Sequence, residues 1–194
     1  MKTTVSILTV LATAGVAAAG PANIFDEGVL GDFSDDRFAP TFLDFGLGSN
    51  TVISTTALSN DPVNGDRDYF TFTLDAGESI DSISLLNASN PGGGFDSVAF
   101  VGLAFDSVFD FDPNTNTGPG LVGFVLTTPD LVGTDIVGDL SGGLDSLGAG
   151  EYSFWVQQTG DFLTEVELGF NVVPAPTTAA LLGLGGLVAV RRRR

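Results

Sequence analysis

The chain has 194 residues and a formal net charge of −17, and it lacks both cysteine and histidine. The first absence excludes disulfides and thiolate chemistry, and the second removes the commonest general base and transition-metal ligand. Five of the seven basic residues are Lys2 and Arg191 to Arg194, so the chain between them carries 2 − 24 = −22 charges. A surface so acidic disfavours nucleic-acid binding and attracts cations, of which calcium is the natural candidate outside the cell.

Residues 1–19 have the pattern of a secretory signal peptide. Lys2 is followed by an apolar run from Val5 to Val16 and then by a cluster of small residues. Signal peptidase requires small side chains at the −1 and −3 positions, and Ala17 and Ala19 provide them, so we expect cleavage after Ala19. The alternative interpretation is a buried core helix. The signal-peptide interpretation, which we prefer, predicts export through the inner membrane, with signal peptidase as a partner.

Residues 20–172 predict an all-β mature domain. Gly, Ser, Thr, Asn and Asp interrupt this region every few residues, and short runs of alternating polar and apolar residues lie between them. The expected strands cover residues 68–74, 79–86, 98–105, 121–126, 152–157 and 165–173. Their number and spacing favour a jelly-roll-like antiparallel β-sandwich, flanked by the N-terminal signal helix and a short C-terminal transmembrane helix.

Two oxygen-rich segments of this domain are candidate calcium sites. Alternate Asp and Asn side chains gather the hard oxygen ligands that calcium prefers. The residues of the first segment are Asp106, Asp110, Asp112, Asn114 and Asn116, and those of the second are Asp66 and Asp68. The alternative interpretation is a pair of solvated loops in which Asp and Asn favour turns.

Residues 173–194 form a tail with three parts. The first is the proline motif Val173, Pro174, Ala175 and Pro176, and the second is an apolar run from Ala179 to Val190. Counted from Thr177 the run has 14 residues, whereas a full span needs about 20. The third part is the cluster Arg191, Arg192, Arg193 and Arg194, which is expected to stop transfer on the cytoplasmic side.

This tail resembles the PEP-CTERM sorting signal of bacterial exported proteins, which combines a proline motif, a short Gly/Leu-rich transmembrane stretch and terminal arginines in the same order. The match departs from the family at Ala175, where the motif has Glu. The resemblance implies recognition by an exosortase, transient membrane attachment and removal of the tail near the proline motif. An ordinary anchor that is never cut is the alternative.

The mature domain resembles the bacterial pre-peptidase C-terminal domain in two pieces. Residues 64–80 look like the opening of that family, with an Asp, an aromatic strand and an Ala-Gly turn, and residues 147–156 look like its closing hairpin. The resemblance implies a small non-catalytic accessory domain of secreted proteins that sometimes binds calcium. In that family acids stand at the places of Asp66 and Asp68.

Together these features predict a non-enzymatic protein that is secreted or held at the cell envelope and has no catalytic residues. Calcium and extracellular polysaccharide are its candidate ligands. Two alternatives are a secreted hydrolase of polysaccharide or peptide and a structural subunit that self-assembles with calcium. A hydrolase would need a pair of acids across a cleft, and no sequence feature selects such a pair among 24 acids.

Overall fold

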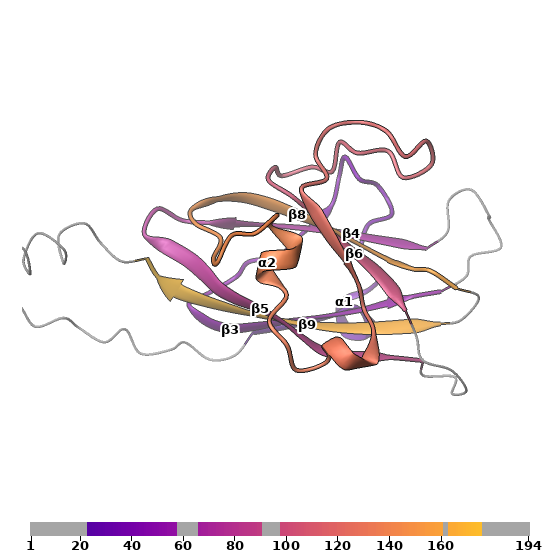
Figure 1. Ribbon diagram of the computed structural model, residues 1–194, viewed down its shortest axis with the longest axis horizontal. Helices are drawn as coiled ribbons and strands as arrows, with labels where there is room; N and C mark the ends of the chain where they lie inside the picture. The colour runs from indigo at the N-terminus through magenta and orange to yellow at the C-terminus, as the bar shows by residue number, and fades with distance from the viewer. Residues whose placement is uncertain (1–22, 58–65, 91–97, 161–162, 176–194) are drawn as a thin grey trace, which may run out of the picture.

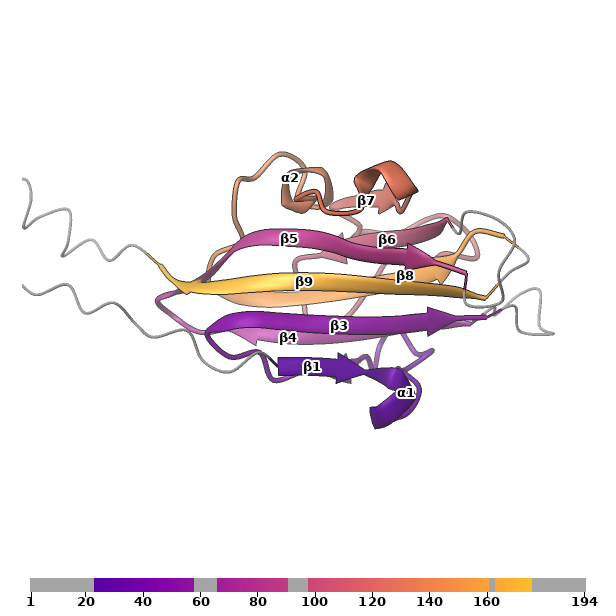
Figure 2. The ribbon, with the colours of Figure 1, turned by 90° about the horizontal axis from the view of Figure 1, so that it is seen from below.

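A computed structural model describes residues 23–57, 66–90, 98–160 and 163–175. Two β-sheets pack face to face as a sandwich (Figures 1 and 2). The signal-cleavage residues Ala17 and Ala19, as well as Pro176 and the four terminal arginines, lie outside the described residues. None of the helices within the described ranges has the length and apolar character needed to cross a membrane.

The first sheet has the strand order β1-β3-β9-β5. Its strands are β1 (Asn23–Asp26), β3 (Gly48–Thr56), β9 (Thr164–Pro174) and β5 (Glu78–Ser89). The second sheet has the order β2-β4-β8-β6-β7. Its strands are β2 (Thr41–Phe42), β4 (Arg67–Leu74), β8 (Gly150–Gln158), β6 (Ala99–Ala104) and β7 (Gly123–Leu126). Each strand expected from the sequence is present, with ends that differ by a few residues.

Three short helical segments interrupt the described strands. They are α1 (Glu27–Leu30), the 3₁₀ turn η1 (Pro129–Leu131) and α2 (Val137–Leu140). Helix α1 begins directly after β1, where the side chain of Asp26 accepts a hydrogen bond from the N–H of Gly28 at 2.8 Å. This is an N-cap contact, and it marks the start of α1 at the end of β1.

The expectation of purely antiparallel sheets is wrong at two edges. Strand β1 pairs in parallel with β3, and β2 pairs in parallel with β4. Both arise because residues 23–47 cross between the sheets: β1 lies on the edge of the first sheet, β2 on the edge of the second, and β3 returns to the first. The segment before residue 48 is therefore part of the sandwich, and each sheet is mixed.

Aromatic side chains fill the space between the sheets. The alternation in β4 directs Phe70 and Phe72 inward, where both are fully buried. Phe170 of β9 meets them from the opposite sheet, with ring centroids 6.3 and 5.7 Å away. Phe154 of β8 lies 5.3 Å from Phe170 in an edge-on arrangement. Such pairs add to the burial free energy of the rings, so this cluster joins the two sheets.

A second, smaller cluster covers the outer face of the second sheet. Tyr69 and Trp155 point to this side, opposite to the inward residues of their strands, and both are buried. Phe109 packs on both rings, at centroid distances of 5.9 Å. Phe109 belongs to the long connection 105–122, which thus lies over this face of the sheet.

The two ends of the described chain lie at the same end of the first sheet (Figure 2). Asn23 at the start of β1 is aligned with Asn50, and Asn50 is aligned with Phe170, four residues before the end of β9. Because β9 runs antiparallel to β3 and β1 runs parallel to it, the chain enters and leaves the sandwich on one side. We call this side the terminal end and the opposite side the distal end.

Replacing Phe170 by Ala is expected to lower the free energy of unfolding by about 3–5 kcal/mol, because it removes a ring that contacts aromatic groups of both sheets. Phe42→Ala is the matched control: Phe42 is 61% exposed on β2 and should change stability by less than about 1 kcal/mol. Urea denaturation of both variants tests this, and equal losses would contradict the assignment of Phe170 to the inter-sheet core.

Candidate metal centre

The first predicted oxygen cluster lies within the connection 105–122. The side chain of Asp106 accepts a hydrogen bond from the N–H of Ser107 at 2.7 Å, and Asp112 accepts one from the N–H of Asn114 at 2.9 Å. Asn116 has a left-handed backbone with φ of 53°, which completes the turn. These contacts show the turn-forming role that Asp and Asn often have in loops.

Two arginines hold this loop against the second sheet. Arg37 donates to the carbonyl of Asp110 at 2.5 Å and lies 3.9 Å from the carboxylate of Asp112. Arg67 donates to the side-chain oxygen of Asn114 at 2.8 Å. The hydrogen bond from Asn114 and the nearby Arg37 lower the pKa of Asp112. The chain between residues 3 and 190 has only these two arginines as basic residues, and both contact this loop.

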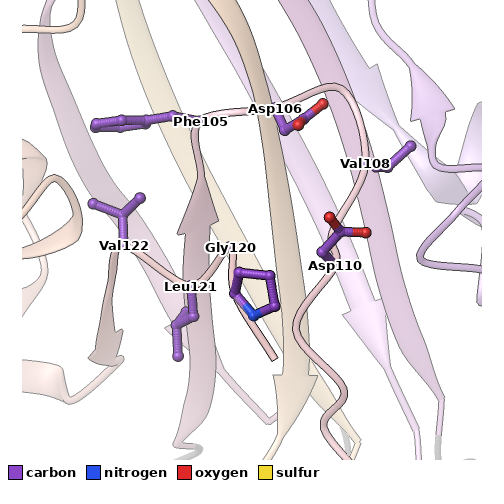
Figure 3. Close-up of a pocket in the computed structure, with 8 residues that line it drawn as sticks. Phe105, Asp106, Val108, Asp110, Gly120, Leu121 and Val122 are labelled. Atoms are coloured by element: carbon purple, nitrogen blue, oxygen red, sulfur yellow. The ribbon is translucent and has the colours of Figure 1, made fainter. Parts of the chain in front are cut away.

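A shallow hollow of about 250 Å³ opens beside the same loop (Figure 3). The carboxylates of Asp106 and Asp110 lie along one side of it, and Phe105, Leu121 and Val122 form the other. The structure thus places two of the five predicted ligands at one hollow and ties Asp112 and Asn114 to arginines. Calcium binding by this loop stays a prediction.

Of the second predicted pair, Asp66 lies just before β4 and Asp68 lies within it. Asp68 has the same inward orientation as Phe70 and Phe72, and it is fully buried between the sheets. The hydroxyl of Ser54, on β3 of the opposite sheet, donates to its Oδ2. Asp66 precedes the strand, and its carboxylate accepts the N–H of Ala57 at 2.5 Å.

The structure brings Asp68 together with two acids that the sequence did not single out. Glu27, the first residue of α1, and Asp32, just beyond that helix, each place a carboxylate oxygen beside it. The three oxygens lie within 4.8 Å of one another. Asp68 is buried, Glu27 is half-buried and Asp32 is exposed, so the group leads from the inter-sheet space to solvent. We call these three residues the carboxylate centre.

Two oxygens of the carboxylate centre have no donor. Asp68 Oδ1 and Glu27 Oε2 are both buried and make no hydrogen bond. A buried polar atom without a partner costs about 1–3 kcal/mol, and a charged one costs more, so such atoms need an explanation. A proton shared between the two carboxyl groups would satisfy them, and so would a cation bound between them.

The carboxylate centre changes the acidity of its members. Burial, and then the negative charge of Glu27, raise the pKa of Asp68 to about 9. Burial also raises the pKa of Glu27, and a hydrogen bond from the backbone of Thr55 counteracts part of that rise. Burial raises the pKa of Asp66 as well, and the charge of Asp32 adds to the rise. Without a cation, the neutral form of Asp68 is therefore favoured near pH 7.

The spacing of the three oxygens suits a hard cation. Calcium takes carboxylate oxygens at about 2.3–2.6 Å, so two of its ligands lie up to roughly 5 Å apart. Water could complete the coordination from the side of Asp32, which is exposed. Sequence reasoning found Asp68 but missed Glu27 and Asp32, which lie 41 and 36 residues earlier with no regular spacing. The pairing of β1 with β3 and the bridge between Ser34 and Tyr69 bring them to β4.

Neither protein-family models nor curated proteins give a match to this chain. The two family resemblances drawn from sequence motifs therefore remain hypotheses.

The raised pKa of Asp68 predicts a pH-dependent stability in the absence of divalent cations. In the unfolded chain this carboxyl titrates near pH 4, and in the folded chain near pH 9. Folding therefore takes up a proton between these values, and the free energy of unfolding should fall as the pH rises from about 5 to 8.5. Denaturation in EDTA at both pH values measures the fall, and Asp68→Asn should make it smaller. An unchanged fall in that variant would refute the assignment.

Proposed function

We propose that this protein is an exported, non-catalytic component of the bacterial cell surface or extracellular matrix. In this proposal its sandwich binds calcium at the carboxylate centre. An exosortase removes its tail. The observation that carries the calcium part is Asp68 Oδ1, a fully buried carboxylate oxygen that lies beside two further carboxylates and has no donor. A cation supplies the positive charge that the centre lacks.

Calcium fits the carboxylate centre better than other common cations. All three groups offer oxygen, and the chain has no cysteine or histidine, so softer transition metals lack their usual ligands. Magnesium requires near-ideal octahedral geometry at 2.0–2.1 Å, whereas calcium accepts 6–8 oxygens in irregular arrangements. Extracellular modules bind calcium with dissociation constants of about 10⁻⁴–10⁻³ M, which suits a site that is open to water at Asp32.

The position of the centre agrees with a surface role. Ser54, the hydrogen-bond partner of Asp68, pairs with Val166 near the beginning of β9, so the centre lies toward the distal end of the sandwich. The chain enters and leaves at the terminal end. A precursor attached by its signal or by its tail would therefore present the carboxylate centre away from the membrane.

The sorting part of the proposal is supported by the sequence of the tail. The proline motif, the short apolar run and the terminal arginines occur in the order of the PEP-CTERM signal. The sandwich would then be a jelly-roll-like accessory module that is released to the envelope or to extracellular polysaccharide. Its excess of acidic side chains favours a matrix whose polymers are neutral or bridged by calcium.

Calcium at about 10 mM is expected to raise the melting temperature of the mature domain by about 5–10 °C at pH 7.5, if that concentration is near a hundred times the dissociation constant. Asp68→Asn and Glu27→Gln should each abolish the rise, because each removes a charged ligand. Calorimetric titration with calcium provides the direct measurement.

Asp112→Asn is the matched control, since Asp112 belongs to the other oxygen-rich segment and contacts Arg37. It should keep the full calcium response. A response lost in Asp112→Asn and retained in Asp68→Asn would move the site to the loop 105–122, and no response in the unchanged protein would refute calcium binding.

Processing at both ends is tested by the intact mass of the protein recovered from envelope and medium. We expect a mass that lacks residues 1–19 and lacks the apolar run with its arginines. A mature protein that keeps Arg191 to Arg194 would mean a permanent anchor and would remove the exosortase from the proposal. Cytoplasmic protein with both ends intact would refute export as well.

A further inference from the structure

Strand β9 extends into the proline motif. Val173 is aligned with Ser79, and Pro174 is aligned with Glu78, both on β5. The N–H of Ala175 then donates to the carbonyl of Gly77 at 2.7 Å. The first three residues of the four-residue motif are therefore held against the sandwich, and their structure is part of the first sheet.

The partner of this segment is the tight turn between β4 and β5, residues 75–78. The N–H of Glu78 donates to the carbonyl of Asp75 at 3.0 Å, and the carboxylate of Glu78 accepts the N–H of Asp75, also at 3.0 Å. Gly77 has a φ of 98°, a conformation that side chains with a Cβ rarely adopt. The turn is thus fixed by two hydrogen bonds and a glycine, and it presents the carbonyl that binds Ala175.

A peptidase acts on a chain whose backbone is free to enter its active site. Bonds in paired strands are cut only when the strand opens, and the cleavage rate falls with the population of the open form. Strand β9 is a central strand between β3 and β5, so opening it would break pairs on both sides over most of its length. Its end at Pro174 is held by β5 alone, together with the turn.

The sequence leaves little room beyond this point. Three residues, Pro176, Thr177 and Thr178, separate Ala175 from the apolar run that begins at Ala179. Fully extended, they span at most about 10 Å. An enzyme in the membrane that binds the segment before the apolar run would therefore contact the turn 75–78, which lies close to that segment on its N-terminal side.

We propose that the turn 75–78 sets the position of tail removal: it protects the Val173–Pro174 and Pro174–Ala175 bonds, and it confines processing to the C-terminal side of Ala175. This inference rests on the proposed exosortase step. In that step an amide bond breaks, the new C-terminal acyl group passes to water or to an acceptor amine, and the tail leaves with a free amino group. The mature protein then keeps the whole of β9.

The first test is mass spectrometry of the C-terminal peptide of the mature protein. A C-terminus at Ala175 or beyond, bearing a carboxylate or an attached acceptor, is expected. A C-terminus at Val173 or Pro174 would overturn the inference while leaving the exosortase proposal intact. An uncut chain would overturn both.

The second test does not depend on the exosortase. The chain from residue 20 to 194, purified in detergent, is digested with proteinase K, and the C-terminus of the resistant core is followed over time. The core of the unchanged protein should end at Ala175 or beyond. Gly77→Val should free the end of β9, so that proteinase K cuts the Val172–Val173 bond about tenfold faster and the core ends before Pro174, because the strained turn no longer holds Ala175.

Gly133→Val is the matched control. Gly133 also has a positive φ, of 84°, and a Cβ placed on either glycine would meet no neighbouring atom within 4 Å. The N–H of Gly133 donates to the carbonyl of Leu85, in a different part of β5. Its core should end where that of the unchanged protein ends. If Gly77→Val does not fold, Glu78→Ala takes its place, because it removes the carboxylate that binds Asp75. Equal protection of the end of β9 in the turn variant and the control would overturn the inference.

Discussion

The structure depends on the aromatic side chains that meet between the two sheets, and these rings do not extend along the whole sandwich. Phe70, Phe72 and Phe170 join the sheets through their middle. Toward the distal end two inward positions are polar: Ser54 on β3 and Asp68 on β4 occupy places where the alternation calls for apolar residues. Burying a carboxyl there is unfavourable unless it is protonated or paired, and the free energy of the aromatic core offsets that cost. The carboxylate centre is therefore a local exception that the rest of the fold makes possible.

The strands and their buried faces were predictable because the signal is local. A period of two residues in β4 and β9 assigns each side chain to a face, and Phe70, Phe72, Val166, Leu168 and Phe170 are buried on the face that this period assigns to them. The parallel edges were not predictable in this way. Strands β1 and β2 have four and two residues, too few to show a period, and their direction follows from how residues 23–47 cross between the sheets. Long-range pairing of such short segments leaves no regular pattern in the sequence.

The same distinction explains what was found of the candidate site. Asp68 was noticed because it stands in an acidic run before an aromatic strand, but its partner in that run, Asp66, binds the N–H of Ala57 instead. Glu27 and Asp32 join Asp68 through tertiary structure alone. The loop of Asp110 and Asp112 has the denser sequence pattern, yet Arg37 and Arg67 bind it, and arginines distant in sequence are invisible to a spacing rule. In this chain the density of oxygen-bearing residues and the absence of a partner for a buried oxygen thus point to different segments.

The two ends of the sandwich have separate tasks in this proposal, and β9 explains how they remain independent. It is the central strand of the first sheet, paired with β3 from Gly48 to Thr56 and with β5 along most of its length. A cut inside the strand would remove pairs from the terminal end, whereas a cut beyond Ala175 leaves each of these pairs in place. Release from the membrane then need not weaken the sheet whose Ser54 binds Asp68 at the distal end. A domain that is first anchored and then released must be cut on the C-terminal side of its last paired residue, so that its fold stays whole. In this chain the hydrogen bond from Ala175 to Gly77 marks that last residue.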